Sequence, residues 1–464
     1  MKSSVYEGKN VTVNYLNTQA TPALEGLDMT IEAGECVLLT GISGSGKSTL
    51  TQVINGLIPH YLPAVVSGES YTLGYATTET PIETYVGEVG SVFQNPKSQH
   101  FATTVRSELA FPLENIGTNV EEIEQQVAFV AERFHLTSLL ERSIFDLSGG
   151  EKQRLAIATA TILKPSVYVF DEITANLDEE SVQQIYEMLR QLKADGATII
   201  LAEHRLAWVM PLVDRVFTLE AGKLTHQLSP QELWNLSREK RQSFGLRTLQ
   251  QKNILDHLLV NQVDNEEDIV TKRLSIGYGD HHKIKSYLNL RFPRYGITAL
   301  TGANGQGKTT LVKTLVGLLP ERGGTIEINH QVISTRERLD NAFLVMQDVN
   351  YQLVSDSVWN EVRLGAKYPQ KAEEILDWLN LSTVKHRHPA SLSGGQKQRV
   401  MIASAILSGK KWLIFDEPTS GLDYYHMTQF GQLLDYLAKK GFRLLVVTHD
   451  VEFINTWCDH VVQI

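Results

Sequence analysis

Cysteine is scarce in this chain of 464 residues, which contains only Cys36 and Cys458, one in each half. Two cysteines cannot form the set of disulfide bonds that stabilises small secreted domains, so we expect free thiols and a reducing compartment. Cys36 lies in a short apolar run that is typical of a buried strand. A core thiol is therefore favoured over a reactive one.

Long apolar runs are also absent. No run approaches the roughly 18 apolar residues that indicate a membrane-spanning helix. Residues 1–7 lack the apolar stretch of a secretory signal. We therefore expect no membrane-spanning segment, and if the chain serves transport, the membrane pore must belong to other chains.

Positive charge is not in excess, because 43 lysine and arginine residues face 53 aspartate and glutamate residues, which gives a formal net charge of −10. Nucleic-acid-binding proteins gather lysine and arginine into a basic surface, so this balance argues against nucleic-acid binding as the main function. A charged, solvated surface that keeps the chain soluble is the simpler interpretation.

What the chain does contain is one series of motifs, present twice in the same order. The first series comprises Gly-Ile-Ser-Gly-Ser-Gly-Lys-Ser at residues 41–48, then Gln94, Leu-Ser-Gly-Gly-Glu at residues 147–151, Asp171, Glu172 and His204. The second comprises Gly-Ala-Asn-Gly-Gln-Gly-Lys-Thr at residues 302–309, then Gln347, Leu-Ser-Gly-Gly-Gln at residues 392–396, Asp416, Glu417 and His449. From the Leu-Ser-Gly-Gly motif to the histidine, corresponding residues are all 245 positions apart. This constant offset indicates a duplicated domain.

The duplication predicts two domains, at residues 1–227 and 270–464, joined by a connection at residues 228–269. Each half is long enough to bury its own core. The connection is polar and charged near both ends, with a helix-compatible segment between. A linker helix followed by a solvated loop is the favoured interpretation, and a docking or regulatory role is the alternative.

Apolar patterning predicts an α/β fold with a mostly parallel sheet. Strands are predicted at residues 11–15, 36–40, 167–170, 198–201 and 275–278, and helices at residues 48–57, 120–134 and 179–192. A helix between two short apolar strands is typical of a β-α-β unit. Residues 95–146 are rich in glutamate and glutamine with helical patterning, which predicts a helical subdomain inserted into the core.

The glycine-rich motifs predict two sites for ATP and Mg²⁺. Glycines let backbone N–H groups converge on phosphate oxygens, and a helix N-terminus follows directly. Lys47 and Lys308 add positive charge, and the hydroxyls of Ser48 and Thr309 can bind Mg²⁺. Asp171 and Asp416 each end an apolar strand, at the edge of an α/β sheet where ligands bind, and such a carboxylate holds Mg²⁺.

The paired motif series resembles that of ABC-type ATPases with two tandem nucleotide-binding domains, over nearly the whole chain. Two stretches, Phe-Gln-Asn-Pro-Lys-Ser-Gln at residues 93–99 and Met-Gln-Asp-Val-Asn-Tyr-Gln-Leu at residues 346–353, are similar to the glutamine-loop region of energy-coupling-factor (cobalt-type) importer ATPases. Asn-Gly-Leu-Ile-Pro at residues 55–59 and Val-Ser-Gly-Glu at residues 66–69 resemble the first half of tandem members of that group. The resemblance implies two P-loop domains, each with a mostly parallel sheet core, an antiparallel β part and an inserted helical subdomain, arranged head-to-tail.

The resemblance also implies roles for single residues. Glu172 and Glu417 are the general bases that polarise the attacking water, with a place in the Mg²⁺ shell as the alternative. The two histidines bind the γ-phosphate, and the two glutamines contact Mg²⁺ and water and relay the nucleotide state to a membrane partner. Tyr15 and Tyr278 stack on adenine, with packing against a strand as the alternative.

Small residues at a helix start make a second phosphate cradle in each half. Because each half already holds phosphates in its own glycine-rich loop, the resemblance implies that each cradle serves the ATP of the other half. Asp178 and Asp423 are expected at that interface. The predicted ATP-binding residues are Tyr15, Gly41, Ser43, Gly44, Ser45, Gly46, Lys47, Ser48, Thr49, Ser148, Gly149, Gly150, Tyr278, Gly302, Asn304, Gly305, Gln306, Gly307, Lys308, Thr309, Thr310, Ser393, Gly394 and Gly395. The predicted metal ligands are Ser48, Gln94, Asp171, Thr309, Gln347 and Asp416, and the predicted catalytic residues are Glu172, Glu417, His204, His449, Gln94 and Gln347.

The resulting functional hypothesis is the ATP-hydrolysing component of an importer of the energy-coupling-factor type, peripheral at the cytoplasmic face of the membrane. The implied partners are transmembrane subunits and a separate membrane protein that captures a vitamin, a vitamin precursor or a metal ion. An exporter ATPase and a soluble tandem ATPase acting on ribosomes or nucleic acid are the alternatives. Neither motif series is degenerate, although Ile173 stands where the second copy has Pro418, so we expect two hydrolytically competent sites.

Overall fold

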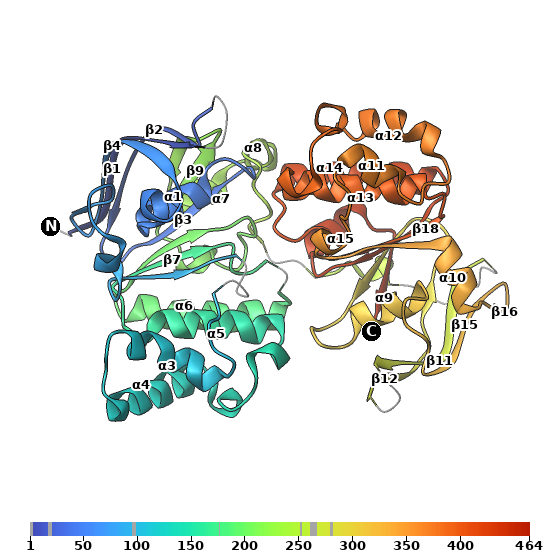
Figure 1. Ribbon diagram of the computed structural model, residues 1–464, viewed down its shortest axis with the longest axis horizontal. Coiled ribbons are helices and arrows are strands. Elements are labelled where there is room, and N and C mark those ends of the chain that lie inside the picture. Colours follow the sequence, from blue (N-terminus) through green and yellow to red (C-terminus); the bar gives the residue numbers. More distant parts are fainter. Residues whose placement is uncertain are drawn as a thin grey trace. The chain divides into compact units, whose positions relative to one another are not determined.

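The computed structural model describes residues 3–16, 21–94, 99–175, 177–250, 253–259, 267–278 and 282–464. Residues 95–98 of the first glutamine-loop stretch, Asn176, residues 264–266 of the connection and His281 lie outside this part. The chain divides into two compact units (Figure 1). Unit 1 is Met1–Gln251 with Gly421–Tyr425, and unit 2 is Lys252–Ser420 with His426–Ile464. The limits at residues 227 and 269 stay a prediction of where each duplicated domain ends.

Unit 1 contains an antiparallel sheet and a larger, mostly parallel sheet. The antiparallel sheet has the order β2 (Leu24–Glu32), β1 (Ser4–Tyr15), β4 (Ala64–Thr72), β5 (Tyr75–Ala76). The larger sheet has the order β10 (Lys223–Leu228), β9 (Arg215–Glu220), β3 (Cys36–Gly41), β8 (Thr198–Ala202), β7 (Val167–Asp171), β6 (Val89–Val92). Its strands are parallel from β9 to β6, and β10 is antiparallel.

The helices of unit 1 flank this larger sheet. They are α1 (Lys47–Ile54), α2 (Leu57–His60), α3 (Val105–Asn115), α4 (Val120–Arg133), α5 (Gly149–Thr161), α6 (Glu179–Ala194), α7 (Pro230–Asn235) and α8 (Arg238–Ser243). Short 3₁₀ helices are η1 (Ile82–Tyr85), η3 (Thr137–Leu139), η4 (Ile144–Asp146) and η5 (Met210–Leu212). None of the helices within the described ranges combines the length and apolar character needed to cross a membrane.

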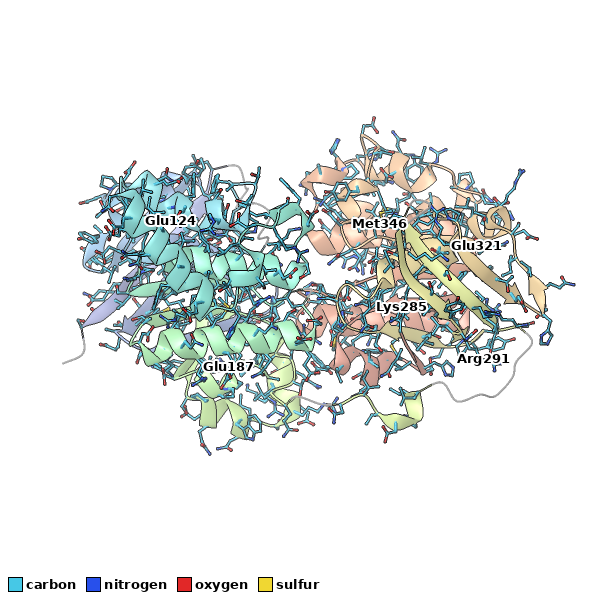
Figure 2. The ribbon with its side chains drawn as sticks, turned by 90° about the horizontal axis from the view of Figure 1, so that it is seen from below. Glu124, Glu187, Lys285, Arg291, Glu321 and Met346 are labelled. Atoms are coloured by element: carbon cyan, nitrogen blue, oxygen red, sulfur yellow. The ribbon has the colours of Figure 1, made fainter. Side chains whose placement is uncertain are left out.

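The parallel sheet is buried on both faces, which explains its short, uniformly apolar strands. In β3, Cys36 and Leu38 face one hydrophobic cluster while Val37 and Leu39 face the other. This follows from the alternation of side chains along a strand. Helix α6 buries one stripe against the first cluster, and Glu187 lies on its partly exposed polar side (Figure 2).

Unit 2 repeats this plan. Its antiparallel sheet has the order β12 (His282–Leu288), β11 (Ile269–Tyr278), β15 (Gly323–Ile328), β16 (Gln331–Val332), and β13 (Arg291–Phe292) also pairs with β11. Its parallel sheet has the order β17 (Ala342–Val345), β18 (Trp412–Asp416), β19 (Arg443–Val447), β14 (Ile297–Thr301), β20 (His460–Gln463). This order matches that of β6, β7, β8, β3 and β9 in unit 1, as the duplication requires.

The helices of unit 2 are correspondingly placed. They are α9 (Lys308–Leu315), α10 (Thr335–Asn341), α11 (Val358–Arg363), α12 (Ala372–Trp378), α13 (Gly394–Leu407), α14 (Tyr424–Lys439, which begins in unit 1) and α15 (Val451–Trp457). The 3₁₀ helices are η6 (Asp256–Leu258), η7 (Val349–Tyr351), η8 (Pro369–Lys371), η9 (Ser382–Val384) and η10 (Pro389–Ser391). In both units a helical subdomain is inserted between the first two strands of this order, β6 and β7 or β17 and β18. The predicted fold class is confirmed.

Several element boundaries differ from the prediction. Strands β1 and β11 begin earlier than expected, at Ser4 and Ile269. Helix α1 ends at Ile54, because Gly56 adopts a φ of 78° that an α-helix cannot continue through. In the connection, helices α7 and α8 lie earlier than expected. Ser229 and Ser237 cap their N-termini, and Gly245, with a φ of 73°, follows the end of α8.

Candidate functional site

The first glycine-rich loop joins the end of β3 to the start of α1. Gly41 and Gly46 have φ values of 141° and 101°. A Cβ at Gly41 would lie 2.1 Å from the carbonyl oxygen of Leu219, and one at Gly46 would lie 2.6 Å from that of Ala23. Backbone therefore packs so closely on this loop that only glycine fits at these two positions.

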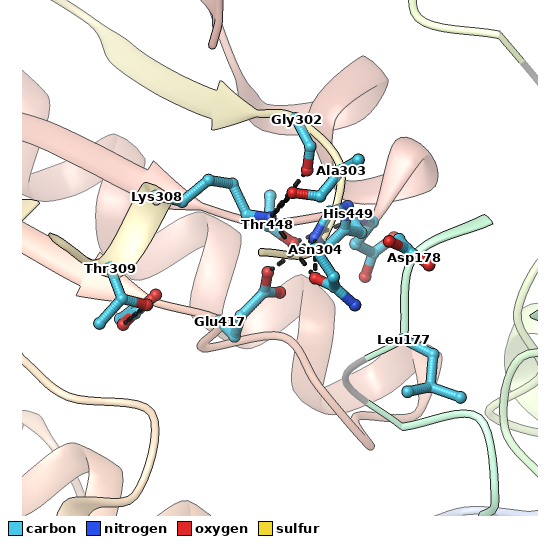
Figure 3. Close-up of polar contacts among 12 residues, drawn as sticks. Leu177, Asp178, Gly302, Ala303, Asn304, Lys308, Thr309, Glu417, Thr448 and His449 are labelled. Atoms are coloured by element: carbon cyan, nitrogen blue, oxygen red, sulfur yellow. Dashed lines mark hydrogen bonds and ion pairs between the residues drawn. The ribbon is translucent and has the colours of Figure 1, made fainter. Parts of the chain in front are cut away.

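A buried lysine occupies the centre of each loop. Lys47 Nζ donates hydrogen bonds to the carbonyl oxygens of Gly41 and Ile42, both at 3.1 Å. Burial lowers the pKa of Lys47, and the carboxylates around it, Glu172 first among them, act in the opposite direction. In unit 2, Lys308 Nζ donates to the carbonyl oxygens of Gly302 and Ala303, at 2.7 Å and 3.1 Å (Figure 3). The predicted role of each lysine in binding phosphate stays a prediction.

A strand-end aspartate and a helix-start hydroxyl meet in both units. In unit 2, Thr309 Oγ1 donates to Asp416 Oδ2 at 2.9 Å. In unit 1, burial raises the pKa of Asp171 to about 6, and a hydrogen bond with the Ser48 side chain opposes the shift. Oδ1 of Asp171 is buried and has no hydrogen-bond partner among the described residues.

These pairs fit Mg²⁺ bound together with a nucleotide. The described ranges contain no group of three or more histidine, cysteine, aspartate or glutamate residues that could hold a metal alone. One carboxylate and one hydroxyl leave the remaining coordination positions to phosphate oxygens and water, which is how Mg²⁺ usually binds in ATPases. Gln94 and Gln347, the other predicted ligands, are exposed near the ends of β6 and β17.

The predicted catalytic residues of unit 1 converge. Glu172 Oε1 lies 3.2 Å from His204 Nε2, and Glu172 Oε2 accepts a hydrogen bond from Gln94 Nε2 at 2.8 Å. Ser43 Oγ lies 3.4 Å from the same histidine nitrogen. Burial, followed by the nearby charge of Lys47, lowers the pKa of His204, which therefore stays neutral at pH 7.

The unit 2 site repeats the contact between glutamate and histidine. Glu417 Oε1 lies 3.4 Å from His449 Nε2, which is also 3.1 Å from Asn304 Oδ1 (Figure 3). Glu417 and Glu172 both adopt a φ of 49°, in the left-handed region. That conformation costs energy for a residue other than glycine, and such residues are concentrated at functional sites. The left-handed backbone conformation ends the extended strand at each glutamate.

The two predicted adenine-stacking tyrosines lie beside the helices that follow the loops. Tyr15 Oη is 3.1 Å from both Thr49 Oγ1 and Gln52 Oε1. Thr310 Oγ1 donates to Tyr278 Oη at 3.4 Å, and Tyr278 is exposed. The hydroxyl contacts hold both rings near the nucleotide loops, and adenine stacking stays a prediction.

The Leu-Ser-Gly-Gly motifs form N-terminal capping boxes. Ser148 Oγ accepts from Glu151 N at 3.2 Å, and the Glu151 carboxylate accepts from Ser148 N at 2.7 Å. Ser393 and Gln396 repeat this at 3.3 Å and 3.0 Å. Gly149 and Gly394, the first helical residues, are exposed. Each motif thus presents an exposed helix N-terminus, which can bind a phosphate.

Of the two predicted interface aspartates, Asp423 contacts the first glycine-rich loop within unit 1. Its Oδ2 accepts a hydrogen bond from Ser43 N at 2.5 Å. Asp178 caps α6, because its side chain accepts a hydrogen bond from Ser181 N at 2.9 Å, and its place at the interface stays a prediction.

Comparison with known proteins agrees with this geometry. Residues 24–175 and 286–420 match the family model of the ABC transporter. A protein of Treponema denticola that bears the name of an ABC transporter ATP-binding protein is 40% identical, over 98% of this chain and 94% of its own length. The chain belongs to the ABC transporter ATP-binding proteins. A similarly named protein of Saccharolobus solfataricus is 33% identical, over 98% of this chain and 91% of its own length.

One solved structure shows that the ABC fold extends over the whole chain. It is a model of ribosome-bound archaeal Pelota and ABCE1, with a TM-score of 0.67 and 23% identity, covering 97% of this chain and 76% of that one. At this identity the similarity concerns the fold alone. The chain is therefore an ABC ATPase with two tandem domains, and ATP binding and hydrolysis follow from the family.

Sequence reasoning missed one buried group of the ABC ATPase site. Glu203 precedes His204, is 2% exposed, and contacts Thr174, two residues after Glu172. The signal was present, because the constant offset of the repeat aligns Glu203 with Thr448. An acidic residue beside a motif histidine in only one copy could have been identified from this alignment.

Proposed function

We propose that this chain is the ATP-hydrolysing subunit of a membrane importer of the energy-coupling-factor type, bound at the cytoplasmic face of the membrane. Its cargo is a small solute such as a vitamin, a vitamin precursor or a metal ion. In this proposal the two halves pair head-to-tail around ATP, and transmembrane subunits together with a separate substrate-capture protein complete the importer. The observation that carries the proposal is an apolar groove beside the glutamine loop of unit 1.

The groove has a volume of about 390 Å³ and lies between β6, α3 and α5. Phe101, Phe111, Pro112 and Ile116 line it, together with Val86, Val89 and Leu163. The Phe101 side chain is 72% exposed and stacks on Phe111 with ring centroids 5.0 Å apart. A hydrophobic groove of this kind fits the apolar face of a short amphipathic helix.

A buried glutamate fixes the exposed aromatic residue at the rim of the groove. Glu108 accepts hydrogen bonds from the backbone N–H of Phe101 and of Ala102, at 3.0 Å and 2.8 Å. His100 Nδ1 lies 3.3 Å from the same carboxylate. Holding a large apolar side chain in water is unfavourable unless a partner covers it, so this fixed exposure favours a docking role.

Unit 2 has the same arrangement of a glutamate that accepts hydrogen bonds from the backbone beside an exposed apolar residue. Glu361 accepts hydrogen bonds from the backbone N–H of Val354 and Ser355, at 2.9 Å and 2.7 Å. Val354 is 72% exposed, like its counterpart Phe101. Each half therefore presents one apolar side chain immediately after its glutamine loop, which suits a membrane partner that contacts both halves.

The groove is also connected to the chemistry of ATP. Gln94 is hydrogen-bonded to Glu172, and the groove residue Gln99 follows five positions later. Gln99 is itself fixed to β6, because Oε1 accepts from Phe93 N at 2.8 Å and Nε2 donates to Ser91 O at 3.1 Å. The groove lining thus begins within a few residues of the glutamine that contacts the catalytic glutamate.

The test is gentle detergent extraction of membranes carrying the tagged full chain, followed by identification of stoichiometric partners. We expect small multi-span membrane proteins to co-purify with the wild type and with F129D, since Phe129 is an exposed phenylalanine outside the groove on α4. We expect F101D to lose them while keeping the ATPase activity of the purified chain.

Three outcomes would contradict the proposal. Recovery with ribosomes or nucleic acid in the soluble fraction would favour the soluble tandem ATPase class. Equal partner recovery with F101D and F129D would exclude the groove as the docking site. ATP-driven efflux rather than uptake, measured after reconstitution of the purified complex into vesicles with its solute, would favour an exporter.

A further inference from the structure

The two halves differ at the residue that precedes the histidine of each ATP site. In unit 1 this residue is Glu203, whose Oε1 accepts hydrogen bonds from Thr174 N at 3.1 Å and from Thr174 Oγ1 at 2.9 Å. In unit 2 it is Thr448, whose hydroxyl lies 3.0 Å from that of Thr419. The same two segments are thus joined by a buried carboxyl group in one half and by two hydroxyls in the other.

The contact in unit 1 joins the two segments that carry the catalytic pair, Glu172 and His204. Thr174 is two residues after Glu172, and Glu203 is one residue before His204. The backbone also joins these segments, since Glu172 N donates to Ala202 O at 2.8 Å. Glu203 with its partner Thr174 therefore links the segment that carries the general base to the segment that carries the histidine.

We propose that Glu203 is a positioning residue of the unit 1 ATP site, which holds Glu172 against His204 and makes turnover at this site fall under alkaline conditions. The proposal rests on the ATPase activity of the family and not on the importer proposal. The unit 2 site lacks this response, because a threonine hydroxyl cannot ionise in the accessible pH range.

The charges around Glu203 explain the direction of the response. Burial, followed by the negative charge of Glu172, raises the pKa of Glu203 to about 8, while the hydrogen bonds from Thr174 and the charge of Arg205 act in the opposite direction. Lys47 also faces this carboxyl group. At pH 7 Glu203 is a neutral acid. Above pH 8 it places a buried negative charge within the electrostatic reach of Glu172 and of the phosphate-binding lysine, which disfavours both the bound nucleotide and the catalytic geometry.

The experiment measures kcat and KM for ATP in the purified full chain between pH 6.5 and 9.5. The first variant is E203Q, whose amide oxygen can accept the hydrogen bonds from Thr174 but which cannot ionise. The second is E203T, which introduces the residue that unit 2 has at this position. T448S, which keeps the hydroxyl in unit 2, is the matched control. We expect E203T to lower kcat at pH 7.5 by about a third to a half, because the unit 2 site still turns over. KM should stay within about twofold, because the substitution weakens positioning and not ATP binding.

We expect E203Q to keep kcat at neutral pH and to lose the decline that the wild type shows between pH 8 and pH 9, whereas T448S should retain that decline. A fall in melting temperature for E203T with unchanged kcat and pH profile would overturn the proposal, since that result indicates a purely structural role. Superimposable profiles of wild type and E203Q would overturn it as well. Failure to find a membrane partner leaves this test intact, because only ATP turnover is measured.

Discussion

Glu172 Oε1 lies 3.2 Å from His204 Nε2 in one half of the chain, and in the other Glu417 Oε1 lies 3.4 Å from His449 Nε2. A carboxylate beside a histidine, with a lysine-bearing loop in the same unit, can orient a water molecule toward the terminal phosphate of ATP. Because both halves have a glutamate in contact with a histidine, neither site lacks this part of the hydrolytic machinery.

The first prediction is that both sites hydrolyse ATP. E172Q and E417Q should each lower ATP turnover of the purified chain by at least about half, and the double variant should lower it by about 10²-fold or more, because general-base catalysis is lost at both sites. Steady-state phosphate release checks this. One single variant with wild-type turnover would show that its site contributes nothing.

The second prediction separates capping from phosphate binding. S148A and S393A remove side chains that cap α5 and α13, and S229A and S334A remove equivalent capping boxes at α7 and α10. All four should lose about 1 kcal/mol of unfolding free energy. We expect only the first two to lower ATPase activity, each by about half or more, because each serves one of the two ATP sites. Equal ATPase in all four would show that the Leu-Ser-Gly-Gly serines act in stability alone.

The duplication made most of the fold predictable. A constant offset of 245 residues between the second parts of the two halves aligns β7 with β18 and β8 with β19. Because Asp171 and Asp416 each end an apolar strand, parallel-sheet geometry places them at the carboxyl edge of the sheet, where α1 and α9 begin. Local patterning and topology therefore locate the loop lysines and the strand-end aspartates of both ATP sites.

The groove and the buried Glu203 could not be predicted, because they depend on tertiary contacts that a local sequence pattern does not reveal. The groove beside Gln94 forms because Glu108 accepts hydrogen bonds from the backbone of Phe101 and Ala102, and a glutamate within a helical pattern is ordinarily predicted as exposed. Glu203 is buried for the same kind of reason, since its Oε1 accepts hydrogen bonds from the backbone N–H and the hydroxyl of Thr174. Buried carboxyl groups with backbone partners are tertiary features and escape reasoning from periodicity.

The third prediction concerns the two thiols. Cys36 and Cys458 are free and buried. Burial raises the pKa of the Cys36 thiol to about 12 and also raises that of Cys458. Because the thiolate is the reactive form, at most about one-twentieth of either should be alkylated by iodoacetamide at pH 8 in the native state. Both should react fully in denaturant, as read by mass spectrometry. Rapid native labelling of Cys36 would contradict its place in the core of the parallel sheet.

The last prediction concerns stability against pH. The pKa of Glu203 is about 8 in the folded chain and about 4.3 when unfolded. The folded state therefore keeps a proton that the unfolded state releases between these values. The stabilising contribution of this proton is fully present below about pH 4 and is lost as the pH rises toward 8.

Calorimetry of the wild type and of E203Q at pH 5 and pH 8 tests this linkage. The melting temperature of unit 1 should fall between the two pH values by at least about 2–4 °C more in the wild type than in E203Q, because only the wild type carries the ionisable group. T448S in unit 2 should follow the wild type, since threonine and serine hydroxyls do not titrate in this range. An identical pH dependence in wild type and E203Q would mean that Glu203 ionises in the folded chain much as it does when unfolded.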